Sequence, residues 1–402
     1  MFEGVRRRIV DVAAVAPRAY WYVWWGTLIN RLGGFVIPLL TIYLVTVRGL
    51  SVSEAGGVVS VFGAGSIAAS QVGGYLTDHL GRKITLVLSL FGGAVALTAL
   101  GLVRDITAIA AMVGAVGFVG ELYRPAVYAI VADLVPPAQR VQAYGLLHWV
   151  INIGFAFAAI VGGLVADRDF AILFFADAAT MAIYGLIVVL AVPETRPARQ
   201  APHASAGPAR RSRPWFTDRP FVAFVLIMFG IALLPVQAGA TLSAHMTWQG
   251  FSPAAFGAVM SVNGVLIIVL QPTLSAWCVR LDATRVITAA ALCYGAGLAL
   301  HGLAGGLALH AAAVLVWTVG EILESPVRSS LVAAMSPADA RGRYQGAVVM
   351  TFGAAQLVGP KLGTWLWQHE GPGTPWLFGA GLAVIVALAL AAAGPAIRRR
   401  AA

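Results

Sequence analysis

The sequence has few charged residues. Of its 402 residues, 11% are Asp, Glu, Lys or Arg, whereas 59% are hydrophobic. Soluble domains carry roughly 25% charged residues on average, so this chain has too few charges to cover a surface that faces water. This shortage excludes an ordinary soluble protein.

Cysteines and catalytic motifs are also scarce. The chain has two cysteines, Cys278 at the inner end of one apolar segment and Cys293 within the next. Neither is expected on the outer face, so no disulfide is predicted. No phosphate-binding loop, metal-ligand cluster or nucleophile–base arrangement occurs, and the N-terminus has no pattern of a removable signal peptide. We therefore expect no enzyme and no cofactor, with a proton gradient rather than ATP as the energy source.

Long apolar segments, in contrast, recur along the whole chain. Each has about twenty residues, enough to cross the hydrocarbon core of a bilayer. The sequence thus predicts an all-α integral membrane protein, embedded in a lipid bilayer. Twelve transmembrane helices are expected near residues 20–46, 54–76, 84–103, 107–134, 141–166, 170–192, 221–243, 254–278, 286–305, 309–333, 344–367 and 376–393.

The positions of the basic residues predict the topology. Of 27 Lys and Arg residues, twenty fall in the two tails and in loops on one side, and three on the other side. Because cytoplasmic loops carry an excess of Lys and Arg, both termini are predicted to be cytoplasmic. This distribution explains the net charge of +10 without nucleic acid. It indicates a multi-pass cell membrane protein.

One long polar break divides the chain. It runs from Pro193 to Pro220, is rich in Pro, Arg and Ala, and separates six predicted spans from six. The predicted units are residues 1–195, a cytoplasmic linker at 196–214, and residues 215–402.

The two units contain a similar sequence pattern. Val119-Gly120-Glu121 matches Val319-Gly320-Glu321, and Pro136-x-x-x-Arg140 matches Pro337-x-x-x-Arg341 at nearly the same offset. These matches place 107–134 and 309–333 as equivalent spans of the same orientation. The pattern favours a parallel repeat of two halves.

A glycine-rich loop follows the second predicted span. Gly74-Tyr-Leu-Thr-Asp78-His79-Leu-Gly81-Arg82-Lys83 closely resembles the signature cytoplasmic loop of the major facilitator superfamily, with His79 in place of its usual first Arg. The resemblance covers nearly the whole chain. It implies twelve transmembrane helices in two six-helix bundles related by a pseudo-twofold axis, and no enzymatic activity.

The same resemblance implies a conformational latch between the halves in the outward-facing state. Asp78 is expected at the start of the span at 344–367, where a helix N-terminus favours an anion. Arg82 is expected to reach Asp133. A basic turn that only sets topology is the alternative. The latch candidates are Gly74, Asp78, Gly81, Arg82, Lys83 and Asp133.

Two further elements resemble the drug:proton antiporter branch with twelve spans. The fifth span carries Gly145, Gly154 and Ala158-Ala159 in the spacing of the antiporter motif, with Ala-Ala where that motif has Gly-Pro. The eleventh carries Gly359-Pro360-x-x-Gly363. Both imply export of a substrate against protons.

Eight charged residues fall inside predicted spans. Each costs about 2.5–3.5 kcal/mol at a helix centre on insertion scales, so each needs a partner or a function. They are Arg31, Glu121, Arg124, Asp177, Glu321, Glu324, Arg328 and Lys361.

The acidic residues among these are candidates for proton coupling. Spacings of three and four residues predict that Glu321, Glu324 and Arg328 share one helical face. We expect Glu121 or Glu324 to carry the coupling proton, with Glu321 a further candidate and Arg124 or Arg328 tuning its charge. Static ion pairs that hold helices together are the alternative.

A second set is expected to line a substrate cavity. It comprises Asn30, Arg31, Phe35 and Trp317. Pairing of Arg31 with a carboxylate of the fourth span, and packing of the aromatic residues, are the alternatives. Asp177 is expected to be structural, Lys361 to reach outward, and His148 and His245 to pack.

The function that these patterns favour is proton-coupled export of small apolar or cationic organic molecules by a monomer. The alternative is uptake or exchange of an anionic metabolite, suggested by the intramembrane arginines and Lys361. A membrane enzyme or a sensor is a third reading, which the missing catalytic residues disfavour.

Overall fold

The computed structural model describes residues 15–34, 36–50, 52–166, 170–196, 214–238 and 240–401. These residues form helices and no strands. The α-helices are α2 (Arg18–Leu32), α3 (Val36–Thr46), α4 (Val52–His79), α5 (Arg82–Leu102), α6 (Ile106–Val119), α7 (Tyr123–Leu134), α8 (Arg140–Ala166), α9 (Phe170–Ala191), α10 (Arg219–Val236), α11 (Ala240–Trp248), α12 (Pro253–Cys278), α13 (Ala283–Leu303), α14 (Leu307–Met335), α15 (Arg341–Glu370) and α16 (Thr374–Ala401).

Every predicted span lies on a helix, but three spans expected to be continuous are divided. These are 20–46, 107–134 and 221–243. In the second, α6 ends with Gly120 as its C-cap. In the third, α10 ends at Val236, directly after Pro235, which has no backbone N–H to donate. Hydrophobicity predicts the length of a membrane span but not an interruption of its helical hydrogen bonds, and the stretches Ile106–Leu134 and Arg219–Trp248 are each still long and apolar enough to cross a membrane.

Nine stretches of the described residues are long and apolar enough to cross a membrane. They include the divided spans α6–α7 and α10–α11. The helix α15 is not among them, since it carries Arg341, Arg343, Lys361 and other polar residues. The membrane nature of the protein is therefore clear, and the count of twelve spans stays a prediction.

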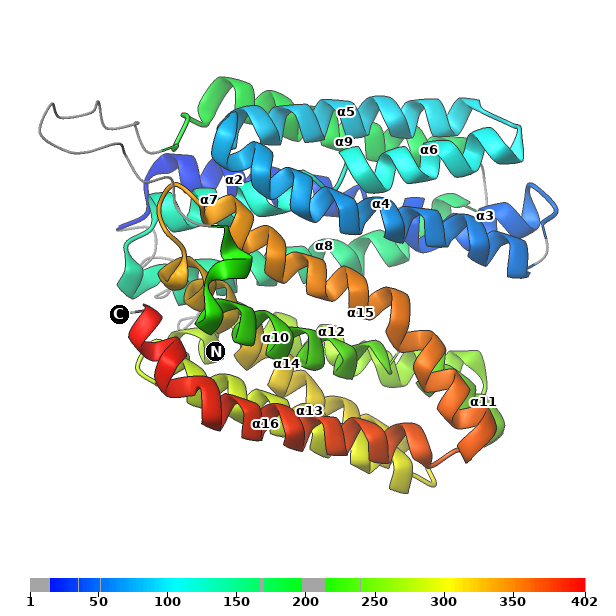
Figure 1. Cartoon of the computed structure of the whole chain (residues 1–402). Helices are drawn as coiled ribbons and strands as arrows, with labels where there is room; N and C mark the ends of the chain where they lie inside the picture. The colour runs from blue at the N-terminus through cyan, green and yellow to red at the C-terminus, as the bar shows by residue number, and fades with distance from the viewer. Residues whose placement is uncertain are drawn as a thin grey trace, which may run out of the picture.

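The helices form two groups with separate apolar cores. One core is built almost entirely from α2–α9, and the other from α10–α16. The start of α2 and the end of α16 lie at the same end of the molecule (Figure 1).

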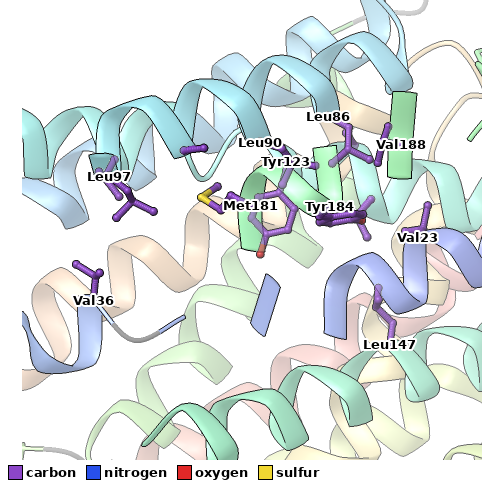
Figure 2. Close-up of a cluster of buried hydrophobic side chains, with 14 of the residues drawn as sticks. Val23, Val36, Leu86, Leu90, Leu97, Tyr123, Leu147, Met181, Tyr184 and Val188 are labelled. Carbon is purple, nitrogen blue, oxygen red and sulfur yellow. The ribbon is translucent and has the colours of Figure 1, made fainter. Parts of the chain in front are cut away.

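Within the first core, aromatic and aliphatic side chains from distant helices interlock. Leu86 and Leu90 of α5 lie beside Met181 and Tyr184 of α9 (Figure 2). Tyr184 fits directly against Gly26 of α2, where a Cβ would overlap its ring. Small residues of this kind let membrane helices approach closely.

Helices of the two groups pack against each other. α4 and α7 pack against α15, and α8 packs against α12 and α14. Trp149 of α8 donates a hydrogen bond to the Ile268 carbonyl oxygen of α12 at 2.8 Å. The candidate site lies along these contacts.

Candidate functional site

Asp78 connects the end of α4 to the first turn of α15. Its carboxylate accepts hydrogen bonds from the backbone N–H groups of Gly342 at 2.8 Å and Arg343 at 2.9 Å, and from Arg343 Nε at 3.0 Å. The first turn of a helix has free N–H groups and a positive dipole end, so it binds an anion well. The predicted placement of Asp78 is confirmed.

Asp133, at the end of α7, binds two arginines, one from each of the two helix groups. Arg82 Nε donates to its Oδ2 at 2.9 Å, and Arg341 of α15 forms an ion pair with its Oδ1. Arg82 is fully buried and also donates to the Ala338 carbonyl oxygen at 3.0 Å. The predicted Arg82–Asp133 contact is present. Arg341 had appeared in the repeat pattern, but its position beside Asp133 was not expected.

Lys83 and Gly81 hold the loop to its own half. Lys83 Nζ donates to the Val189 carbonyl oxygen at 2.8 Å, and the backbone of Lys83 donates to Glu194 at 3.1 Å. Gly81 has a φ of +114°, which favours glycine. These hydrogen bonds of Lys83 anchor the turn to its own half, and a part for Lys83 in the latch stays a prediction.

His79, which stands where the family loop has an arginine, contacts Tyr75 of its own helix. Its ring stacks on Tyr75 with centroids 3.8 Å apart, and its Nδ1 lies 2.9 Å from the Tyr75 carbonyl oxygen. Both partners belong to α4. His79 therefore stabilises the end of its own helix.

Glycines allow α4 and α15 to touch along their backbones. A Cβ on Gly74 would lie 2.6 Å from the Gly342 carbonyl oxygen, and one on Gly346 would overlap the Ser70 carbonyl oxygen. A side chain at either position would push the helices apart.

Two of the membrane carboxylates each pair with an arginine in their own half. Glu121 pairs with Arg124 at the break between α6 and α7, where their side chains are 11% and 42% exposed. Glu324 lies 3.1 Å from Arg328, with exposures of 2% and 12%. The Arg328 guanidinium also lies 4.1 Å above the Phe352 ring of α15.

Glu321 has different partners from those of its neighbours on α14. Its Oε2 accepts a hydrogen bond from Asn263 of α12 at 2.9 Å, and its Oε1 faces His148 Nε2 of α8 at 3.8 Å. Glu321, Glu324 and Arg328 were expected to share one helical face, and along that face Glu321 has partners on α12 and α8 whereas Glu324 pairs with Arg328, since side-chain contacts depend on the neighbouring helices as well as on helical spacing. His148, expected to pack, is the group that Glu321 meets across the two halves.

The break between α2 and α3 is supported by Asp177. This buried carboxylate of α9 accepts a hydrogen bond from the first backbone N–H of α3, that of Val36, at 3.3 Å. This contact stabilises the start of α3, a structural role of the kind expected for Asp177. Phe35, a predicted cavity residue, lies outside the described residues.

Arg31 ends α2 next to that break. Its guanidinium lies 5.5 Å above the Tyr123 ring, and among the described residues its Nε has no hydrogen-bond partner. No described carboxylate lies within ion-pair distance, so the pairing with the fourth span considered for Arg31 is not formed. Asn30 beside it is 8% exposed.

Trp317 does not have the surroundings of a cavity residue. It is 4% exposed, belongs to the second apolar core and packs against Gly297 of α13. Packing, the alternative reading for this residue, describes it better. Lys361 of α15 is exposed, as an outward-reaching lysine requires.

The two antiporter-like elements have different roles in packing. Gly154 of α8 fits against the Cβ of Arg31. Gly359 of α15 accepts a hydrogen bond from Gln237 Nε2, at the end of α10, at 3.2 Å. Ala158 is buried, and the side chain of Ala159 is outside the description.

A chain of histidines that the sequence did not reveal connects α11, α13 and α14. His301 Nδ1 lies 2.9 Å from His310 Nδ1, His310 Nε2 lies 2.8 Å from Gln249 Oε1, and Gln249 Nε2 lies 3.2 Å from His245 Nε2. No signal in the sequence links positions so far apart. Within the described ranges, no His, Cys, Asp or Glu group could hold a metal ion.

Two relatives resemble the chain in sequence. It is 24% identical over 365 residues to the multidrug resistance protein MdtH of Salmonella newport, covering 89% of this chain and 90% of the relative. It is 22% identical over 356 residues to a Na(+), Li(+), K(+)/H(+) antiporter of Planococcus maritimus, covering 81% and 84%.

A solved structure shares the fold. The human organic anion transporter MFSD10 (TETRAN) superimposes with a TM-score of 0.76 at 19% identity, covering 93% of this chain and 99% of that one.

The family model of the Major Facilitator Superfamily matches residues 23–248 and 221–401, nearly the whole chain. Members of this family are membrane transporters, not enzymes. This match, together with the helices and the loop contacts between them, shows that the chain belongs to the major facilitator superfamily.

Proposed function

We propose that this transporter exports small organic molecules in exchange for protons by alternating access. Its twelve spans would form two six-helix bundles, residues 1–195 and 215–402, joined by the linker at 196–214, with both termini in the cytoplasm. The bundles would rock against each other around a site near the midplane.

The contacts between the halves support an outward-facing state. Asp78 and Asp133 bind the start of α15 beside the predicted cytoplasmic loops. Towards the other end of α4, Gly63 has no neighbour within 4 Å of an added Cβ, in contrast to Gly74. The latch candidates would thus close the cytoplasmic side.

The single observation that carries proton coupling is the Glu324–Arg328 pair. Glu324 is 2% exposed, and its Oε1 has no hydrogen-bond partner among the described residues apart from the ion-pair contact. Burial favours the neutral acid, whereas the nearby arginine favours the carboxylate. Movement of water to this pair on a change of state would therefore bind or release a proton, and Glu121 with Arg124 would be the equivalent pair in the first half.

The activities named for two relatives agree with this proposal. One is a multidrug resistance protein and the other a cation/proton antiporter. A second candidate, transport of an organic anion, has its own support in the unpaired Nε of Arg31 and in the name of MFSD10.

Transport in everted vesicles tests direction and charge together. With an imposed proton gradient, an exporter accumulates its substrate inside, and an uncoupler abolishes the accumulation. Substrates are found first by screening toxic compounds for resistance on expression. Accumulation of anions alone, or accumulation that ignores the uncoupler, would favour the second candidate.

A further inference from the structure

Glu321 is the acidic residue that meets the opposite half of the protein. It lies on α14, and the group facing its Oε1 is His148 on α8. Glu121 and Glu324 each have an arginine partner, whereas among the described residues Glu321 has no Lys or Arg within 4.0 Å. A carboxylate in the membrane without a cation is costly, so it marks a site where one binds.

The hydrogen bonds around Glu321 satisfy one of its oxygens. Asn263 Nδ2 donates to Oε2 at 2.9 Å and lies 3.1 Å from Thr318 Oγ1. Oε1 is 3.8 Å from His148 Nε2, too far for a direct N–H···O bond. The remaining oxygen is therefore available to a donor from outside.

The Asn152 amide identifies the tautomer of the His148 ring. Asn152 Nδ2 donates to the His148 carbonyl oxygen at 2.9 Å, which fixes the orientation of that amide. The same Nδ2 lies 3.2 Å from His148 Nε2, so Nε2 accepts there and the ring proton is assigned to Nδ1. A ring nitrogen has one lone pair, and at Nε2 it accepts the Asn152 N–H, so a donor from a ligand binds there by displacing that single 3.2 Å hydrogen bond, while Asn152 keeps its bond to the carbonyl oxygen. Glu321 Oε1 and His148 Nε2 are then two acceptors that face each other across the boundary between the halves.

Both acceptors are accessible, unlike the nearby ion pair. The Glu321 and His148 side chains are 24% and 19% exposed, whereas Glu324, one turn further along α14, is 2% exposed. Arg328 is held by Glu324 and by the Phe352 ring, and among the described residues it forms no ion pair with Glu321. A ligand can reach Glu321 without breaking that pair.

We propose that Glu321 and His148 form a two-point site for an N–H group of an organic cation. The N–H group donates to Glu321 Oε1 and, in place of the Asn152 amide, to His148 Nε2; the two acceptors lie 3.8 Å apart, close enough together for one donor group to bridge them. Because the acceptors belong to different halves, the bound cation links α8 to α14. This inference rests on the proposed function and names the substrate class.

Binding to the purified full-length protein at constant pH tests the site without any gradient. The probes are rhodamine 6G, a cation with N–H groups, and tetraphenylphosphonium, a cation without them. Glu321→Gln is expected to weaken rhodamine 6G binding at least about tenfold, the effect of losing about 1.4 kcal/mol. His148→Phe is expected to weaken rhodamine 6G several-fold and to leave tetraphenylphosphonium binding nearly unchanged.

Glu370→Gln is the matched control, because Glu370 is an exposed carboxylate at the end of α15. Unchanged rhodamine 6G affinity in Glu321→Gln, or an equal loss in Glu370→Gln, overturns the proposal. Preferential binding of an anion such as fluorescein overturns it as well. Failure of proton-driven export with this binding pattern intact would reject the proposed function and leave the site standing.

A measurement on the unmodified protein covers the case in which a variant does not fold. Dicyclohexylcarbodiimide labels membrane carboxyl groups, and peptide mapping locates the label. Rhodamine 6G is expected to protect Glu321 several-fold more than Glu121. Equal labelling of Glu321 with and without rhodamine 6G contradicts the site.

Discussion

Gly74 of α4 and Gly342 of α15 face each other so closely that neither can carry a side chain. A Cβ on Gly74 would lie 2.6 Å from the Gly342 carbonyl oxygen, and a Cβ on Gly342 would lie 2.5 Å from the Gly74 carbonyl oxygen. Both obstacles are backbone atoms of long helices, which cannot move independently. The contact therefore closes only when both residues are glycine.

Replacing Gly74 with valine is expected to prevent closure of the latch end. The protein would accumulate with α4 and α15 apart there, and transport would fall at least about tenfold if the closed state is destabilised by about 1.4 kcal/mol or more. Spin labels on the exposed residues Leu80 and Ala338 would report a longer distance than in the parent protein. Gly57→Val is the control, since nothing lies within 4 Å of its added Cβ; similar spectra for both variants would disagree with this account.

Asp78 is expected to act through its charge as well as its shape. Asp78→Asn keeps an acceptor for the Gly342 N–H but loses the anion at the α15 N-terminus, with a cost of about 0.3–2 kcal/mol. Asp78→Ala also leaves the N–H groups of Gly342 and Arg343 without their partner, and should cost more. The Leu80–Ala338 distance should increase from the parent protein to Asp78→Asn and again to Asp78→Ala. The reverse order of the two variants would contradict the predicted contribution of the Asp78 charge.

Asp133→Ala is expected to destabilise the closed state more than Arg341→Ala. The first removes the 2.9 Å carboxylate partner of the fully buried Arg82 and leaves it only Asp78, at 3.8 Å; breaking a buried ion pair typically costs about 3–5 kcal/mol. The second leaves the Arg82–Asp133 pair intact. Thermal unfolding in detergent measures both, with Arg104→Ala as an exposed control; equal losses in Asp133→Ala and Arg341→Ala would argue against the central place of Arg82.

Asp177→Ala is expected to lower stability by about 1 kcal/mol without changing which substrates are transported. Its carboxylate accepts a hydrogen bond from the first N–H of α3, in the manner of an N-cap supplied by another helix. Asp177→Asn, which keeps an acceptor, should lose less. A change of substrate preference with unaltered melting would instead give Asp177 a place in binding.

The latch contacts could be predicted from the sequence because local motifs encode them. The spacing of Asp78 and Arg82 in one loop, and the position of Asp133 at a span end, indicated their partners through the family resemblance. The contact of Arg341 with Asp133 was missed because it needs the relative placement of α7 and α15, which no local pattern contains.

The intramembrane site was harder to predict for a related reason. Spacing along α14 placed Glu321 with Glu324 and Arg328, but its partners come from α12 and α8. The same limit hid the link of His310 to Gln249, since these residues are 61 positions apart. Hydrophobic periodicity predicts that a helix exists, whereas side-chain partners depend on how helices are rotated against each other.

Substrate-driven proton flux is the most direct measurement of the central claim. Reconstituted vesicles containing the parent protein, Glu324→Gln or Glu121→Gln would be given substrate, with an entrapped pH dye as the readout. Proton movement is expected in the parent protein and strong loss in at least one of the two variants, with substrate counterflow retained because it needs no net proton transfer. Normal proton flux in both variants would contradict the account.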